Sequence, residues 1–448
     1  MKETCPDTER TLRMTTRFIH FTQRAQAEPE LKFNALMGLM CDPQGLRESF
    51  ERQPGNKAPG VDGVRKCDYA QEVEQHLAAL SRRLHRMGYV PKPARRAYIP
   101  KGDSGRRPLG IPSFEDRIVQ DRLSRILQAL WEPIFRGCSY GFRPGRSAHQ
   151  ALRRLTQIVT RERTQWVVEA DIKGFFNNVC HDHLMRFVQQ RISDPGVLRI
   201  IRRFLKAGYL EEGLVQPNER GTPQGGLVSP VLANIYLHYV LDLWFEKRYA
   251  RSCNGKAYLV RYADDFVACF EEEQDAKGFV LELQKRLSLF GLEVEPSKTA
   301  TLRFGSLAPW GCRREGRRRP QTFNFLGFTH FVTRSRGGRF AVGRRTQRER
   351  IRKKLKAVGQ RLSRLRPAGA RAMVEFARRH LEGHIQYYGV SGNSRSLRCY
   401  GYQLARLLFQ WLNRRSQRRS LTWQRYAVLL PRLLPRPRIV HHLYAQPL

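Results

Sequence analysis

The chain has 448 residues, 41% of them hydrophobic, which is enough for two or three domains with substantial cores. It carries 81 Lys and Arg against 40 Asp and Glu, a net charge of +41. This composition argues against a disordered chain and favours a polyanionic partner, of which nucleic acid is the obvious one. No apolar stretch is long enough to cross a membrane and the nine cysteines form no CxxC pair, so we expect a cytoplasmic protein without a disulfide scaffold or zinc ribbon.

The first third of the chain is predicted to contain helices and one hairpin. Residues 1–50 have helical patterns, and the Gly- and Pro-rich loop at 53–63 marks the entry to the main domain. A helix over 72–87 precedes two strands, near 96–101 and 106–112, which are joined by a tight turn. A long helix is predicted after them, over residues 114–135.

The middle of the chain alternates short strands with helices. The strands are predicted at 166–171, 257–262, 265–270, 292–294 and 323–332, and the helices at 183–192, 196–207, 228–247 and 274–290. This order predicts an α+β fold in which an antiparallel sheet carries helices on one face.

The pattern changes near residue 340, where we place a domain boundary. Three helical segments follow, with basic polar faces, at 346–364, 368–388 and 396–415. Residues 311–448 hold 33 Lys and Arg but only four acids, a distribution that repels itself unless a polyanion offsets it. The run Arg313–Arg319 is predicted to be a mobile loop that becomes ordered on nucleic acid.

Two adjacent acids are the most informative local feature. Residues 258–270 read Tyr-Leu-Val-Arg-Tyr-Ala-Asp-Asp-Phe-Val-Ala-Cys-Phe, which predicts two strands with Ala263 and Asp264 near the bend. The carboxylates of Asp264 and Asp265 repel each other and lose hydration there, and a divalent cation relieves both costs. A polar hairpin tip without a ligand is the alternative interpretation.

A third acid, Asp171, ends the apolar run that starts at Trp166. Acids at the ends of adjacent strands can converge, and a two-metal site needs several carboxylates around cations about 3.5–4 Å apart. Asp171, Asp264 and Asp265 are therefore our candidate triad, although a strand-ending or N-cap role would explain Asp171 alone.

Cationic and flexible positions accompany these acids. Lys101 and Arg107 flank the predicted 102–105 turn, where cations could offset charge on a leaving pyrophosphate, and Arg106 could replace Arg107. Exposed basic residues without a ligand explain them equally well. The loop Gly221-Thr-Pro-Gln-Gly-Gly lacks the Gly-Lys-Ser/Thr of a Walker A motif, Lys298 follows a short strand, and Gly327 lies where backbone could approach a bound strand.

With these residues in view, the chain resembles a bacterial group II intron reverse transcriptase/maturase from Lys57 to about Arg415. The matching blocks appear in the order of that family: Lys57-Ala-Pro-Gly-Val-Asp-Gly, Tyr98-Ile-Pro-Lys with Arg107-Pro-Leu-Gly-Ile-Pro, Asp116-Arg-Ile-Val-Gln, Tyr140-Gly-Phe-Arg-Pro-Gly-Arg-Ser, Asp171-Ile-Lys-Gly-Phe-Phe, Thr222-Pro-Gln-Gly-Gly, Tyr262-Ala-Asp-Asp, Pro296-Ser-Lys-Thr and Phe325-Leu-Gly-Phe. The resemblance implies a right-hand polymerase with fingers, palm and thumb.

The resemblance also implies residue roles. Asp171, Ile172, Asp264 and Asp265 would bind two Mg²⁺ ions, with Mn²⁺ as a substitute. Lys101, Arg107, Ile172, Phe175, Gln224 and Lys298 would bind the deoxynucleotide, with Phe175 screening the sugar 2′ position. Arg143, Arg146 and Gly327 would contact nucleic acid.

The implied domains are a helical extension (1–55), fingers and palm (56–340), a helical thumb/maturase domain (341–415) and a basic tail that is a candidate DNA-binding segment (416–448). Only Cys312 and Cys399 follow residue 300, so we expect no paired-cysteine nuclease domain. The implied partners are group II intron RNA, an RNA template with a DNA or RNA primer, a DNA target and dNTPs. The alternatives are a free-standing or defence-associated reverse transcriptase, a splicing factor without polymerase activity, and an RNA-templated RNA polymerase.

Overall fold

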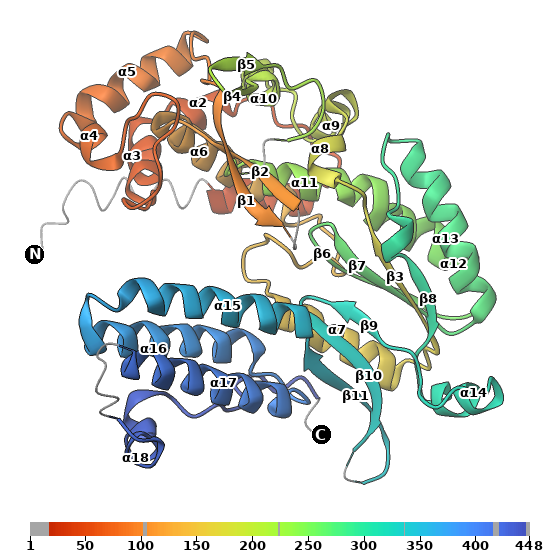
Figure 1. Ribbon diagram of the computed structural model, residues 1–448. Helices are drawn as coiled ribbons and strands as arrows, with labels where there is room; N and C mark the ends of the chain where they lie inside the picture. Colours follow the sequence, from red (N-terminus) through yellow and green to blue (C-terminus); the bar gives the residue numbers. More distant parts are fainter. Residues whose placement is uncertain (1–17, 102–104, 223–224, 336, 415–420, 445–448) are drawn as a thin grey trace, which may run out of the picture.

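The structure is a computed structural model and describes residues 18–101, 105–222, 225–335, 337–414 and 421–444, without the side chains of Pro100, Lys101 and Arg107. Within these ranges it is an α+β protein, as expected, and its strands form three sheets, whereas the sequence predicted one (Figure 1). None of the helices within the described ranges has the length and apolar character to cross a bilayer.

A four-stranded antiparallel sheet forms the centre of the molecule. Its strands run in the order β6-β7-β3-β8, with bounds β3 (Trp166–Asp171), β6 (Ala257–Tyr262), β7 (Asp265–Phe270) and β8 (Ala300–Arg303). Successive side chains on a strand point to opposite faces. Accordingly, Val168 joins one hydrophobic core and Val167 joins a second.

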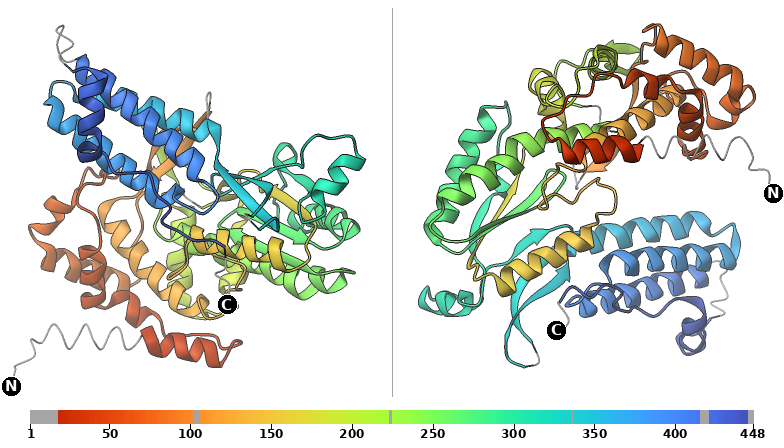
Figure 2. Two further views of the ribbon diagram at one scale, coloured as in Figure 1. Left: turned by 90° about the horizontal axis from the view of Figure 1, so that it is seen from below. Right: turned by 180° about the vertical axis from the view of Figure 1, so that it is seen from behind.

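Helices cover both faces of this sheet, whereas the sequence predicted helices on one face only. The first face packs on α13 (Glu273–Ser288) and on the long helix that begins as α11 (Ser229–Leu237). The second face packs on α7 (Ala148–Arg161), as Figure 2 shows. The prediction missed this layer because it placed no helix between residue 135 and the strand at 166, where α7 lies.

Helix α7 begins at a capping box. The Ser147 hydroxyl accepts a hydrogen bond from the Gln150 N–H, and the Gln150 side chain accepts one from the Ser147 N–H. This arrangement satisfies two of the N–H groups that a helix start leaves without partners. The long helix after α11 instead continues through two π-helical turns, η1 (His238–Asp242) and η2 (Phe245–Tyr249), into α12 (Ala250–Ser252).

A second sheet and several helices form an N-terminal lobe. The sheet has the order β2-β1-β4-β5, with bounds β1 (Ala94–Lys101), β2 (Gly105–Ile111), β4 (Tyr209–Glu211) and β5 (Leu214–Gln216). The helices are α2 (Met37–Cys41), α3 (Pro43–Glu51), α4 (Lys66–Ala70), α5 (Val73–His85), α6 (Phe114–Trp131), α8 (Phe175–Asn178), α9 (His181–Val188) and α10 (Pro195–Lys206). A further helix covers 18–27.

A third sheet leads into the C-terminal helices. It has the order β11-β10-β9, with bounds β9 (Phe323–Phe325), β10 (Phe328–Arg334) and β11 (Phe340–Thr346). Helices α15 (Arg348–Leu365), α16 (Gly369–Tyr388) and α17 (Ser394–Asn413) then pack side by side, close to their predicted bounds. Before this sheet come η3 (Pro296–Lys298) and α14 (Ala308–Arg314), which occupies part of the predicted 313–319 loop.

The described part of the predicted C-terminal tail is integrated into the fold. Helix α18 (Trp423–Leu433) buries Tyr426 completely, and the segment after it buries Leu443. Tyr444 then donates a hydrogen bond to the Val342 carbonyl of β11, with an O···O distance of 2.7 Å. Residues 421–444 therefore form a strap across the C-terminal helices and β11 instead of a free appendage.

Candidate active site

The β6–β7 turn presents the paired acids in a strained conformation. Tyr262 pairs with Asp265, so Ala263 and Asp264 form the turn itself. Ala263 has φ of 58°, in the left-handed region that costs a residue with a Cβ about 1–2 kcal/mol. Such strain persists only where the surroundings hold it.

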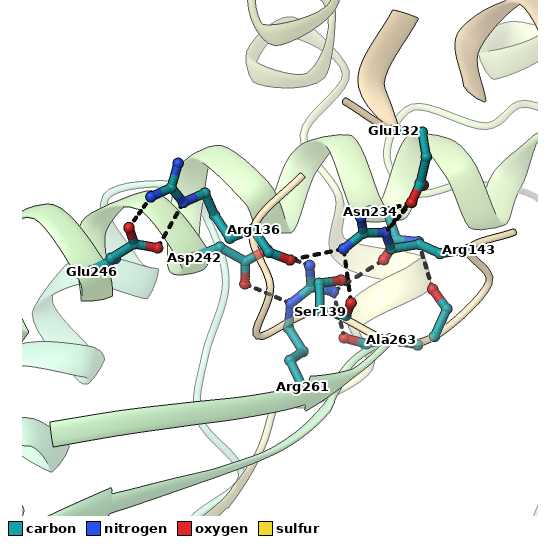
Figure 3. Close-up of polar contacts among 10 residues, drawn as sticks. Glu132, Arg136, Ser139, Arg143, Asn234, Asp242, Glu246, Arg261 and Ala263 are labelled. Atoms are coloured by element: carbon teal, nitrogen blue, oxygen red, sulfur yellow. Dashed lines mark hydrogen bonds and ion pairs between the residues drawn. The ribbon is translucent and has the colours of Figure 1, made fainter. Parts of the chain in front are cut away.

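A buried network holds this turn from behind (Figure 3). Arg261 and Asp242 form an ion pair of 2.5 Å in which both side chains are fully buried. The Arg261 guanidinium also donates to the Ala263 carbonyl (2.9 Å) and to Asn234 Oδ1 (3.1 Å). Asn234 in turn donates to the Gly141 carbonyl (2.8 Å). Sequence reasoning missed this network, although an Arg within the apolar β6 pattern was a usable signal.

Gly141 closes the network because no side chain fits at its position. A Cβ there would lie 2.4 Å from the Ala263 nitrogen and 2.9 Å from the Tyr262 carbonyl carbon. Both are backbone atoms, which cannot move aside without displacing the turn. The 140–147 block therefore supports the turn directly.

Asp171 meets the pair at the end of the neighbouring strand. It is the last residue of β3, and its backbone pairs directly with Asp265 of β7. The structure thus brings the three predicted acids together from two adjacent strands. Ile172 follows with its side chain 2% exposed, so only its carbonyl oxygen could contribute to a ligand set.

The carboxylates make this site strongly anionic. Burial raises the pKa of Asp265 to about 7, and the charges of Asp264, Asp171 and Glu169 act in the same direction, whereas a hydrogen bond from the Leu326 N–H opposes them. Burial also raises the pKa of Glu169. Both shifts mean that the ionised carboxylates are disfavoured here, mainly by burial, and a bound cation would offset that cost.

Lys298 provides part of that charge. Its ammonium lies 2.5 Å from Asp171 Oδ2, and this hydrogen bond raises the pKa of the lysine. Within the described residues no three acidic, His or Cys side chains are arranged as a ready ligand set. The carboxylate oxygens of Asp171, Asp264 and Asp265 are the type of ligand that a hard cation such as Mg²⁺ prefers. To bind such a cation, Asp171 would have to give up its hydrogen bond with Lys298.

A second turn lies beside the acids and connects them to the C-terminal helices. Leu326 and Gly327 form the β9–β10 turn with φ of 50° and 83°. The Leu326 N–H faces Asp265, and its carbonyl accepts a hydrogen bond of 2.9 Å from Tyr387 Oη on α16. Gly327, which the resemblance assigned to nucleic acid, thus lies close to the acidic centre.

The structure does not support the predicted role of Phe175. Its side chain is only 1% exposed and packs inside the main core. Phe176, the next residue on α8, is partly exposed, and its ring centre lies 5.4 Å from that of Phe175. Because a screening side chain must touch the sugar, Phe176 replaces Phe175 as the candidate.

The glycine-rich loop packs against α8 and β2. Gly221 has φ of 85°, and a Cβ there would lie 2.6 Å from the Phe176 carbonyl oxygen. The Thr222 N–H donates to the same oxygen at 2.7 Å. A Cβ at Gly225 would lie 2.3 Å from the Gly110 oxygen of β2. Gln224 lies outside the described residues.

The basic hairpin is formed as predicted, although only its backbone can be placed. Lys101 ends β1 opposite Gly105, and Arg107 of β2 pairs with Ile99. The side chains of Lys101 and Arg107 lie outside the described part of the structure. The Arg106 side chain is exposed.

The two arginines expected on phosphates occupy different environments. Arg143 is 7% exposed and donates to Glu132 at 2.7 Å and to the carbonyls of Arg136 and Ser139 at 2.8 Å. These internal bonds use the donors that a phosphate would need, so Arg143 supports the loop. Arg146 is exposed, with its guanidinium 5.5 Å from the Tyr140 ring centre.

Comparisons with known proteins agree with these motifs. Residues 99–330 match the family described as reverse transcriptase (RNA-dependent DNA polymerase). Protein YkfC of Escherichia coli is 38% identical over 239 residues, which are 52% of this chain and 62% of YkfC. The group II intron-encoded protein LtrA of Lactococcus lactis is 37% identical over 227 residues, 50% of this chain and 38% of LtrA. A putative COX1/OXI3 intron 1 protein of Saccharomyces cerevisiae is 31% identical over 222 residues, 48% of this chain and 25% of the yeast protein.

These relatives confirm the resemblance to intron-encoded reverse transcriptases. The aligned part spans less than two thirds of each relative's own length. The family match itself covers more than half of the 448 residues and includes all three acids of the site. The chain therefore belongs to the reverse transcriptase (RNA-dependent DNA polymerase) family.

Proposed function

We propose that this protein is an RNA-directed DNA polymerase of the group II intron type, which extends a DNA or RNA primer with dNTPs and also binds intron RNA to assist splicing and mobility. The observation that carries the proposal is the direct pairing of Asp171 with Asp265 beside the Asp264 turn, in a chain of the reverse transcriptase family. In right-hand terms, the fingers and palm would span 56–340 and the thumb would follow from 341.

Asp171, Asp264 and Asp265, with the Ile172 carbonyl, would hold two Mg²⁺ ions. Bound Mg²⁺ supplies charge stabilisation for the attacking and leaving oxygens of nucleotidyl transfer. The protein's own part is positional. The Arg261 network fixes the turn that carries Asp264, and the Leu326 N–H fixes Asp265.

Other residues would act on the nucleotide. Lys298 is already charged and beside Asp171, so it can hold a proton or a phosphate oxygen once Asp171 takes up a cation. Lys101 ends β1 and Arg107 lies two residues inside β2, and both would contact the triphosphate from this hairpin. Phe176 would meet the sugar and favour deoxynucleotides by steric exclusion.

Binding of intron RNA is supported by the relatives and by charge. LtrA is named as a group II intron-encoded protein, and the yeast relative as an intron protein. Helices α15–α17 present many exposed arginines and lysines along their lengths. Arginine side chains and interleaved aromatic rings suit RNA, where phosphate contact and stacking do most of the recognition.

Primer extension on an RNA template with dNTPs and Mg²⁺ tests the proposal. We expect cDNA from the wild type and none from the Asp264→Asn/Asp265→Asn double variant, while Glu282→Gln, an exposed carboxylate on α13, should retain full activity. A splicing assay with group II intron RNA tests the second activity, which the double variant should keep. Absence of cDNA from folded wild-type protein would refute the polymerase role, and splicing without it would indicate a pure splicing factor.

A further inference from the structure

A second basic surface lies at the opposite end of the central sheet from the acids. Trp166 starts β3 and pairs with Phe270 and Arg303, whereas Asp171 ends it. At about 3.3 Å per residue the two ends are about 16 Å apart. Helix α14 packs at the Trp166 end, away from the β6–β7 turn and from α15 (Figure 1).

Helix α14 exposes a tryptophan instead of burying it. Trp310 is 53% exposed, although neighbouring Gly311 and Cys312 on the same helix are buried. The Arg314 guanidinium lies 4.7 Å from the centre of the Trp310 ring. An exposed indole ring with a cation beside it offers a face on which an unstacked base can stack.

The position of helix α14 is held by specific contacts. The Leu307 N–H donates to Gln165 Oε1 at 3.1 Å, and Gly311 packs on the Arg303 side chain so closely that a Cβ would lie 2.1 Å from its guanidinium. Arg303 itself stacks on Trp166, with its guanidinium 4.8 Å from the ring centre. The buried side of α14 is therefore fixed, and Trp310 faces outward.

Five exposed arginines follow Leu307 with one acid among them. These are Arg313, Arg314, Arg317, Arg318 and Arg319, and Glu315 forms an ion pair with Arg317. The cluster keeps a large positive charge with almost no internal neutralisation.

A groove of about 780 Å³ extends this surface between α7 and the β10–β11 hairpin. Its walls include Thr156, Thr160, Arg161, Arg334, Arg339 and Tyr444. Arg161 is the last residue of α7, and the chain runs directly from it to Gln165, which contacts the start of α14. The groove and the start of α14 therefore both adjoin the 161–165 segment.

A buried arginine, Arg344, contacts the wall of the groove from inside the protein. Arg344 is 1% exposed and donates to the hydroxyl of Thr156 in the groove wall. Among the residues that the structure describes, no carboxylate forms an ion pair with Arg344, and Glu162 at the end of α7 is turned toward Tyr258, which donates to it at 2.8 Å. The groove consequently has a positive potential along its length.

We propose that the groove and the α14 cluster together bind a single-stranded segment of nucleic acid, separately from the primer and template at the acidic site. The phosphates would lie along Arg161, Arg334 and Arg339 and the α14 arginines, and one unstacked base would lie on Trp310. A single strand fits better than a duplex because only an unstacked base offers its face to an indole ring. This goes beyond the proposed function, which concerns the acidic site and α15–α17.

Fluorescence anisotropy of the full chain tests this inference. The probe is a labelled single-stranded RNA of about 15 nucleotides, the upper range for such sites, with an unlabelled primer–template occupying the acidic site. We expect Trp310→Ala to weaken binding by roughly fivefold to a hundredfold, since one stacking contact is lost. Trp310→Phe should recover most of the affinity.

Charge reversal separates this site from general attraction. Arg318→Glu/Arg319→Glu should lower the slope of log affinity against log salt by about 1.4, or 0.7 for each lost phosphate contact. The matched control is Arg248→Glu/Arg251→Glu, an equal charge change on the η2–α12 segment, whose slope should stay near that of the wild type. All variants should extend a short primer–template normally, which separates this test from that of the polymerase proposal.

Two outcomes would overturn the inference. One is wild-type affinity and salt dependence in both Trp310→Ala and Arg318→Glu/Arg319→Glu. The other is equal weakening by the Arg248→Glu/Arg251→Glu control, which would mean non-specific attraction. A single-stranded DNA probe is measured in parallel. If Trp310→Ala weakens DNA binding as much as RNA binding, the site recognises phosphates and bases and accepts both nucleic acids. If Trp310→Ala weakens only RNA binding, the site is selective for RNA.

Discussion

Alanine substitutions at Phe175 and Phe176 should have opposite effects: the first should reduce stability, and the second should change nucleotide selectivity. Phe175 is 1% exposed, with its ring 6.2 Å from that of Tyr236, so Phe175→Ala leaves a large cavity and should cost about 3–5 kcal/mol of unfolding free energy. That loss raises the unfolded fraction by roughly a hundredfold to a few thousandfold. Phe176 is partly exposed, so Phe176→Ala should cost about half as much or less.

The nucleotide preference should change in the other direction. Removing the Phe176 ring opens space beside the sugar, so incorporation of rNTPs relative to dNTPs should rise by roughly tenfold to a hundredfold, the range for apolar rejection of a hydroxyl. Phe175→Ala should leave that ratio unchanged in the protein that remains folded. Thermal unfolding and primer extension with competing rNTPs and dNTPs measure the two effects. A rise in rNTP use in Phe175→Ala, with none in Phe176→Ala, would refute the reassignment.

Three further predictions concern the support of the site and the C-terminal helices. Asp242→Ala leaves the Arg261 charge buried without its partner and should cost about 3–5 kcal/mol, measured by chemical denaturation. Gly141→Ala places a Cβ 2.4 Å from the Ala263 nitrogen and should reduce kcat in primer extension while most of the fold survives. His384 is buried, and burial is the main reason that its pKa is lowered to about 3. Below about pH 6.5 the unfolded chain takes up a proton at this residue and the folded protein does not, so the folded protein should lose stability as the pH falls. Between pH 7.5 and 5.5 the loss in unfolding free energy should be about 1.4 kcal/mol.

Each of these has a matched control. Glu246→Ala removes a partner of Arg136 from an exposed ion pair on the same long helix and should cost at most about 1 kcal/mol. A Cβ at Gly137 meets no atom within 4 Å, so Gly137→Ala should retain activity. His384→Phe keeps a stacking ring without a titrating group and should remove the pH-dependent part assigned to His384. Identical behaviour of a variant and its control would contradict the corresponding prediction.

Local sequence patterns were sufficient for most elements near the site. The nearly continuous apolar residues on both sides of Asp264 predicted both strands of the β6–β7 hairpin. A strand that is buried on both faces carries β-branched and aromatic residues at nearly every position. The three C-terminal helices were predicted within a few residues because their apolar positions recur at helical spacing. The helix seen as α7 was not predicted at all, although its apolar positions recur at helical spacing, and no local pattern shows which sheet face such a helix covers.

The sequence by itself determined that this is a basic nucleic-acid polymerase relative, and that Asp171, Asp264 and Asp265 are its candidate acids. Only the tertiary structure decided which neighbouring side chains serve them. Phe175 and Phe176 are chemically identical, and their backbone position on α8 alone buries one and leaves the other partly exposed. Arg143 was expected on phosphates, and Arg261 lies within an apolar strand pattern, yet only packing shows that Glu132 pairs with the first and Asp242 with the second.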